Sequence, residues 1–99
     1  MTVDTNRVGN TLEIALHGRL DTITSPELEA TIREKLEDAD ELAFDFADLE
    51  YISSAGLRVL LGAHKTMSAR GGMKIMNVNE MVNEVFEITG FADILTIEK

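Results

Sequence analysis

The feature that most constrains the fold is the alternation of strand-like and helix-like segments in the second half of the chain. Short apolar runs at residues 42–46 and 73–78 predict strands, and apolar residues at helical spacing lie between them. Two neighbouring parallel strands need a crossover connection, and a helix is the usual one. The order therefore predicts an α/β domain in which these strands are parallel.

The first half of the chain predicts an antiparallel hairpin. Residues 12–16 alternate between apolar and other side chains, as in a strand with one buried face, and residues 3–8 predict an earlier strand. Gly9 and Asn10 form a turn signal between them. With a last short strand at 95–97, the chain predicts a mixed sheet of four to five strands. The sheet opens with the hairpin, continues with alternating helices and parallel strands, and is covered by the helices.

Start and stop signals predict three helices. Ser25 before Pro26 predicts the N-cap of the first helix, the second follows Ser53, and the third begins after Asn79 and ends at Gly90. The positions expected to face the core are Leu28, Ile32 and Leu36 in the first helix, Leu57, Leu60, Leu61, His64 and Met67 in the second, and Val82, Val85 and Phe86 in the third.

Length and composition exclude several classes of function. The 99 residues fit one domain over 1–99, and the absence of cysteine excludes disulfides and a cysteine nucleophile. Eighteen acidic against nine basic residues give a net charge of −9, which repels nucleic acid. No apolar run approaches the roughly 20 residues of a membrane span, and the first residues do not form a signal peptide. We therefore expect a cytoplasmic protein that does not bind nucleic acid and has no membrane span.

Signals for a cofactor or a metal are weak. No glycine-rich phosphate loop with its lysine is present, and one tyrosine with no tryptophan leaves no stacking platform. Asp45, Asp48 and Glu50 do not follow the spacing of a calcium loop, so we interpret the segment 47–53 as a solvated connection into the second helix. No cofactor and no metal is assigned.

The helix mouth within YISSAGLRVL is the most unusual segment. Ser53 and Ser54 precede an apolar helical pattern, so either serine is a candidate N-cap, and either is a candidate regulated site. A serine hydrolase is the first enzyme to test, but the segment lacks the leading glycine of G-x-S-x-G. His64 lies ten residues beyond Ser54, about 15 Å along a helix, which is too far for a general base.

The segment DFADLEYISSAGLRVLL, residues 45–61, closely resembles the signature of STAS-domain anti-sigma factor antagonists, which are bacterial anti-anti-sigma proteins. The resemblance extends to residues 18–21 (GRLD), to the helix after Pro26, and to Gly90 and Phe91, and so covers nearly the whole chain. It implies a single STAS domain and a regulatory binding protein rather than an enzyme.

In that family, an anti-sigma factor that is also a serine kinase phosphorylates the serine two residues before the motif glycine. That position is Ser54 here, since Gly56 is the motif glycine. Many members carry Asp where this chain has Ser53, and Ser or Thr where it has Ala55, so Ser53 stays the second candidate. The resemblance implies that the unphosphorylated form binds the anti-sigma factor and frees a sigma factor. Phosphorylation ends binding, and a serine phosphatase restores it.

The resemblance and the motif together define a candidate partner surface. Its residues are Asp21, Thr22, Ser53, Ser54, Ala55, Gly56, Leu57 and Arg58. The family assignment leaves two alternatives: a STAS module in another complex, such as a stress-signalling assembly or a lipid-transporter subunit, and a small hydrolase using Ser54. A monomer and a weak homodimer both remain open.

Overall fold

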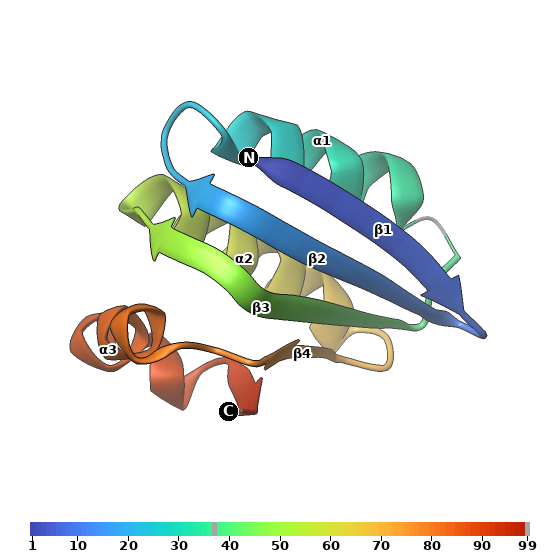
Figure 1. The fold of residues 1–99 in the computed structure, drawn as a ribbon. Helices are drawn as coiled ribbons and strands as arrows, with labels where there is room; N and C mark the ends of the chain where they lie inside the picture. The colour runs from blue at the N-terminus through green and yellow to red at the C-terminus, as the bar shows by residue number, and fades with distance from the viewer. Residues whose placement is uncertain (37, 99) are drawn as a thin grey trace.

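The alternating segments build one five-stranded sheet with helices packed on it (Figure 1). The structure is a computed structural model that describes residues 1–36 and 38–98. Its elements are β1 (Thr2–Val8), β2 (Thr11–Leu20), α1 (Ser25–Lys35), β3 (Glu41–Ile52), α2 (Ser54–Ser68), β4 (Met73–Met76), α3 (Glu80–Thr89), a 3₁₀ turn at Phe91–Asp93 and β5 (Thr96–Glu98).

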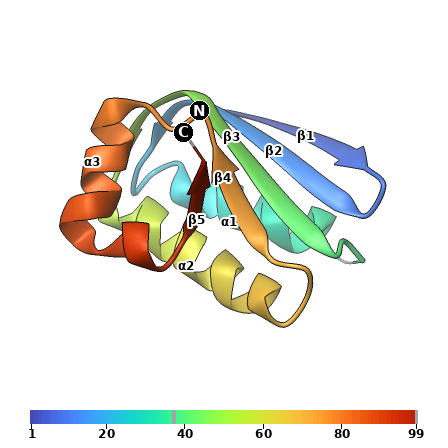
Figure 2. The same ribbon diagram turned by 90° about the horizontal axis from the view of Figure 1, so that it is seen from below.

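The sheet topology confirms the predicted mixed sheet. The strands lie in the order β1-β2-β3-β4-β5, with β1 antiparallel to β2 and all other neighbours parallel. Figures 1 and 2 show α1 and α2 on the same face of the sheet, where the crossovers from β2 to β3 and from β3 to β4 place them. The carboxyl ends of β2 and β3 therefore lie beside the N-termini of α1 and α2.

The core forms between the sheet and the helices. Alternate positions of β2 and β3 point into it, and Phe44 and Phe46 are fully buried with ring centroids 5.6 Å apart. Phe86 of α3 lies over Phe46 with a centroid distance of 6.5 Å. The largest fully buried side chains are Phe44, Phe46, Phe86, Ile14, Leu16, Leu20, Leu28, Leu42, Leu49, Leu60, Met67 and Ile75.

The strand β3 is longer than predicted, and the interpretation of residues 47–53 as a solvated connection is wrong. The pairing of β2 with β3 changes register twice, after Ala15 and after Gly18, and β3 carries an extra residue each time. Such bulges keep a strand in the sheet but break its alternation. Leu49 and Ile52 consequently both face the core. Because Leu49 and Ile52 are three residues apart, the two-residue alternation expected of a strand does not predict that both face the core.

Two details of the helices also differ from prediction. The N-cap of α1 is Thr24, and Ser25 is instead buried in the first turn, where its hydroxyl donates to the carbonyl oxygen of Asp21. In α2, Leu61 and His64 are half-buried, and the innermost side is formed by Gly56, Leu57, Leu60, Ala63 and Met67. Within the described residues, no helix is long and apolar enough to cross a membrane.

The ends of α3 confirm the sequence signals. The side-chain oxygen of Asn79 accepts from the backbone N–H of Val82 at 2.8 Å, and Gly90 ends the helix with a φ of 82°. The side-chain amide of Asn79 also donates to the carbonyl oxygen of Leu49 at 2.7 Å. This residue therefore starts α3 and ties it to β3.

Replacing Asn79 by Ala should lower the free energy of unfolding by about 1–3 kcal/mol, since it removes a helix cap and leaves a carbonyl of β3 unpaired. Urea unfolding followed by circular dichroism measures the change. Asn83→Ala is the matched control. The amide of Asn83 reaches only the exposed carboxylate of Glu87, so its loss should stay within about 0.5 kcal/mol. Equal losses in the two variants would contradict the capping role.

Candidate functional site

The candidate site lies where β2 and β3 end and α2 begins. The backbone N–H of Ser53 donates to the carbonyl oxygen of Leu20 at 2.9 Å, which continues the β2–β3 ladder by one bond. The carbonyl oxygen of Ser53 then accepts the N–H of Leu57 at 3.0 Å, the first helical bond of α2. Strand and helix thus meet at one residue, and the chain has no free linker between them.

The two adjacent serines have different environments. Ser53 is the N-cap of α2, yet it makes no side-chain capping bond, and its hydroxyl oxygen is buried without a hydrogen-bond partner among the described residues. Ser54 is the first residue of the helix and is exposed. Ser54 is therefore accessible from solvent, whereas the hydroxyl of Ser53 is closed off.

Gly56 allows the helix to approach the strands closely. A β-carbon at this position would lie 2.7 Å from Cγ of Leu20 and 3.0 Å from Cγ1 of Ile52. Both neighbours are almost fully buried, at 0% and 3% exposure, so neither has room to move. The motif glycine is therefore a packing requirement that sets how deeply the first turn of α2 sits. Ala55 is half-buried beside it, and Leu57 enters the core.

The loop after β2 is held by its own hydrogen bonds. One carboxylate oxygen of Asp21 accepts the backbone N–H groups of Ile23 and Thr24, each at 3.0 Å. The hydroxyl of Thr24 donates to the carbonyl oxygen of Arg19 at 2.8 Å and accepts from the N–H of Asp21 at 2.9 Å. Asp21 thus has a structural role as well as the predicted position beside the site.

These bonds also affect the titration of Asp21. The backbone N–H of Thr24 is the main cause that holds the pKa of Asp21 below its ordinary value of 3.8, and the Thr24 hydroxyl, the Ile23 N–H and the Arg19 charge add to it. Desolvation acts in the opposite direction without reversing the shift. At neutral pH Asp21 is ionised and adds negative charge to the surface near Ser54.

Two exposed groups near the site were not predicted from the sequence. Ile23, at the tip of the Asp21 loop, is 87% exposed, which is the highest value among the large apolar side chains described as exposed. Tyr51 is partly exposed, and the guanidinium of Arg19 lies 4.2 Å from the centre of its ring. A single apolar residue in a turn carries no pattern, and the pairing of Arg19 with Tyr51 depends on the β2–β3 register. The exposure of Ile23 and the contact of Arg19 with Tyr51 can therefore be seen only in the three-dimensional structure.

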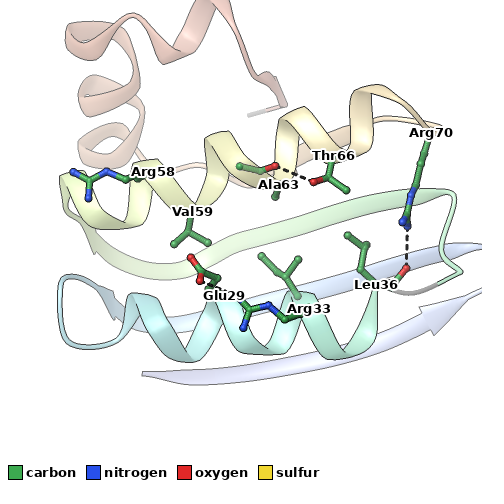
Figure 3. A pocket seen from close by; sticks show the side chains of 10 residues that line it. Glu29, Arg33, Leu36, Arg58, Val59, Ala63, Thr66 and Arg70 are labelled. Atoms are coloured by element: carbon green, nitrogen blue, oxygen red, sulfur yellow. Dashed lines mark hydrogen bonds and ion pairs between the residues drawn. The ribbon is translucent and has the colours of Figure 1, made fainter.

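Two hollows adjoin the first turns of α1 and α2. One, of about 210 Å³, is lined by Thr22, Ser25, Pro26, Glu29, Ala55, Arg58 and Val59. The other is a groove of about 380 Å³ between α1 and α2, shown in Figure 3. Glu29, Arg58 and Val59 line both, so the hollow beside the predicted partner surface continues into the groove. Thr22 and Arg58 thus line one hollow together with Ala55, the residue after Ser54.

The two histidines lie away from Ser54. Both ring nitrogens of His17 face carboxylates, with Nδ1 2.9 Å from Asp48 and Nε2 2.9 Å from Asp4. His64 lines a separate hollow with Gly71 and Gly72 near the other end of α2. The geometry therefore gives no support to the alternative of a serine hydrolase, which needs a base within hydrogen-bond reach of the hydroxyl.

Comparison with known proteins identifies the family. Residues 2–99 match the STAS domain. The chain belongs to the STAS domain family. A curated relative, the anti-sigma-B factor antagonist of Bacillus subtilis (strain 168), is 30% identical over 96 residues, which cover 96% of this chain and 88% of the relative.

Two solved structures share the fold of this STAS domain. The anti-sigma factor antagonist SpoIIAA in its unphosphorylated form has a TM-score of 0.84 and 22% identity, covering 99% of this chain and 89% of that one. The Bacillus cell fate determinant SpoIIAA in the phosphorylated form has a TM-score of 0.75 and 20% identity, covering 99% of this chain and 92% of that one.

The close approach of the STAS motif glycine predicts opposite effects of two alanine substitutions in α2. Gly56→Ala should destabilise the domain by about 1–2 kcal/mol, because overpacking against Leu20 and Ile52 outweighs the gain in helix propensity. Gly62→Ala is the control: a β-carbon there meets nothing within 4 Å, so the change should stabilise by about 0.5–1 kcal/mol. Thermal unfolding gives both signs, and stabilisation by Gly56→Ala would refute the packing argument.

The lowered pKa of Asp21 predicts a pH-dependent contribution to stability. A carboxyl group whose pKa is lower in the folded state stabilises the fold above its ordinary pKa of 3.8, and the contribution is lost as the pH falls through the folded value. Asp21→Asn keeps an oxygen acceptor and removes the charge. We expect the variant to melt below the native protein at pH 7, and the two to converge on the acid side of 3.8. A gap that is independent of pH would contradict this role of the charge.

Proposed function

We propose that this STAS domain is an anti-sigma factor antagonist controlled by phosphorylation of Ser54. In its unphosphorylated form it binds an anti-sigma factor that is also a serine kinase, and this binding releases a sigma factor. Phosphorylation of Ser54 by that kinase ends the association, and a serine phosphatase restores it. The relatives named as anti-sigma factor antagonists support the role, and the geometry of the helix mouth supports the residue.

The observation that carries the proposal is the contrast between the two serines. Ser54 presents its side chain to solvent at the first position of α2, while the oxygen of Ser53 is buried. A phosphoryl group adds three oxygens and about −1.5 to −2 charges, so it fits an open position and not a closed one. The exposed Ile23 gives a partner an apolar anchor on the neighbouring loop.

A phosphate on Ser54 is expected to leave the domain folded. The N-terminus of a helix has N–H groups without intrahelical partners and the positive end of the helix dipole, both of which stabilise an anion. The first turn of α2 contains no acidic residue that would oppose the new charge. The effect must therefore fall on whatever docks over Ser54, through bulk and charge at the interface.

The required energy is modest. A hundredfold loss of affinity corresponds to about 2.7 kcal/mol, and a charge buried unpaired at an interface costs about 2–5 kcal/mol. One phosphate at the centre of the contact is thus sufficient for a switch. No rearrangement of the sheet or of the core is needed.

The proposal predicts opposite binding by two variants of Ser54. Ser54→Ala should hold the anti-sigma factor kinase permanently, and Ser54→Asp should bind it at least tenfold more weakly, since the carboxylate supplies part of the phosphate charge. The kinase is recovered from the source cells on immobilised native protein and identified by ATP binding, and affinities are then measured by calorimetry. Ser53→Ala is the matched control. It should still be phosphorylated, with peptide mapping placing the added mass on residue 54.

Equal affinity of the Ser54→Ala and Ser54→Asp variants for the kinase would overturn the switch. Phosphate mapped to Ser53 would overturn the assignment of the residue. Recovery of a transporter or of a large stress-signalling assembly in place of an ATP-binding kinase would favour the other role of a STAS module.

A further inference from the structure

Arg58 differs from the other four arginines of the chain. Arg7 pairs with Asp38, Arg33 pairs with Glu29, Arg19 lies over Tyr51, and Arg70 donates to the carbonyl oxygens of Leu36 and Ala39. Within residues 1–36 and 38–98, Arg58 has neither an ion-pair partner nor a hydrogen-bond partner, although it is exposed in a chain of net charge −9. Its guanidinium is thus free to bind another group at the predicted partner surface.

The position of Arg58 relates it to one residue in particular. Ser54 and Arg58 are four residues apart in α2, which places both on the same side of the helix. Side chains in a helix lean toward its N-terminus, so a long side chain at position 58 covers the turn that contains Ser54. Figure 3 shows Arg58 at the beginning of α2, well away from Arg33 and Arg70 along the groove.

We propose that Arg58 is the internal ligand of a phosphate on Ser54, forming a guanidinium–phosphate pair across the first turn of α2. This inference rests on the proposed function, because it requires that Ser54 be the modified residue. An acidic group at position i and a basic group at i+4 is the favourable order for a helical ion pair. The planar guanidinium also matches phosphate oxygens with two parallel N–H donors.

The surroundings leave room for this pair. The hollow of about 210 Å³ beside the helix mouth is lined by Thr22, Ala55 and Arg58, among others, and Ala55 directly follows Ser54 in the chain. Glu29 is the one acidic residue in its lining, and it is already bonded to Arg33 at 3.0 Å. The phosphate therefore does not have to displace an existing partner of Arg58.

The pair would give the modification a second effect on the partner surface. In the unmodified protein, Arg58 is free to meet an acidic group of the docking protein. After phosphorylation, Arg58 turns to the phosphate, so that the surface loses a free hydroxyl and a free cation together. Arg58 also borders the groove between α1 and α2, where Arg33 and Arg70 are already engaged. After phosphorylation, all three arginines that line the groove would therefore be paired or hydrogen-bonded.

The test uses protein in which phosphoserine is inserted at position 54 during translation, so that no kinase is required. The phosphate is titrated by ³¹P NMR in the native background and in Arg58→Ala, Arg58→Lys and Lys65→Ala. Phosphoserine ordinarily loses its second proton near pH 6. A guanidinium partner stabilises the dianion, so the midpoint with Arg58 should lie about 0.5 pH unit below that of Arg58→Ala. The helix dipole is common to all variants and cancels.

The controls separate the pair from a general charge effect. Lys65→Ala removes one positive charge from the far part of the same helix, and its midpoint should match that of the native background. Arg58→Lys should fall between native and Arg58→Ala, since it keeps the charge and loses the two parallel donors. The difference should shrink in 1 M salt, where the screening length is about 3 Å.

Equal midpoints for native and Arg58→Ala protein would overturn the inference, and so would a Lys65→Ala midpoint raised as much as that of Arg58→Ala. Neither result would affect the proposed function, which depends on partner binding by the Ser54 variants. Conversely, if Ser54→Ala and Ser54→Asp bind the kinase equally, the proposed function fails even when the titration shows the pair.

Discussion

The site depends on the contact between the first turn of α2 and the ends of β2 and β3. Leu20 and Ile52 lie so close to Gly56 that a single additional carbon would not fit, and the Ser53 N–H is bonded to the carbonyl of Leu20. These two constraints fix both the depth and the start of the helix. As a consequence, the residue before the helix is pressed inward, and the first residue within it faces solvent.

This contact explains why two chemically identical side chains have different environments. Ser53 gives its backbone to the junction of strand and helix, and its hydroxyl is enclosed there. Ser54 is exposed at the first position of α2, which is why we propose it as the modified residue. Moreover, the neighbouring loop is held by Asp21 and Thr24, so a partner does not have to order it on binding. A loop and a helix start that are already ordered lower the conformational entropy lost when a partner binds.

Local signals predicted most of the fold. The opening hairpin, the order of strands and helices, and both ends of α3 follow from alternation, turn residues and caps, each of which acts within a few residues. The error in β3 came from long-range pairing, because its two bulges are defined only against β2. The error at the start of α1 is local: the helix is capped one residue earlier, at Thr24, and the hydroxyl of Ser25 donates to the carbonyl oxygen of Asp21 instead.

The candidate site, like the fold, was predicted from the sequence only in part. The family motif directs attention to Ser54, but the sequence of two adjacent serines contains no information on which hydroxyl is enclosed. That depends on how the first turn of α2 sits on Leu20 and Ile52, which are distant from each other in the chain and are paired in the parallel ladder. The exposure of Ile23 and the placement of Arg19 over Tyr51 likewise require the loop and the register. Residue type alone could not have selected them.

The phosphate that we propose on Ser54 would have to be recognisable on a chain that already carries a net charge of −9. Net charge cannot supply that contrast, because charges farther away than about 8 Å are largely screened at physiological salt. The contrast has to be local. The first turn of α2 has no acidic residue and has one uncommitted arginine at its edge. A dianion on Ser54 would add its charge where the first turn of α2 has no acidic side chain and where Arg58 is close enough to respond to it.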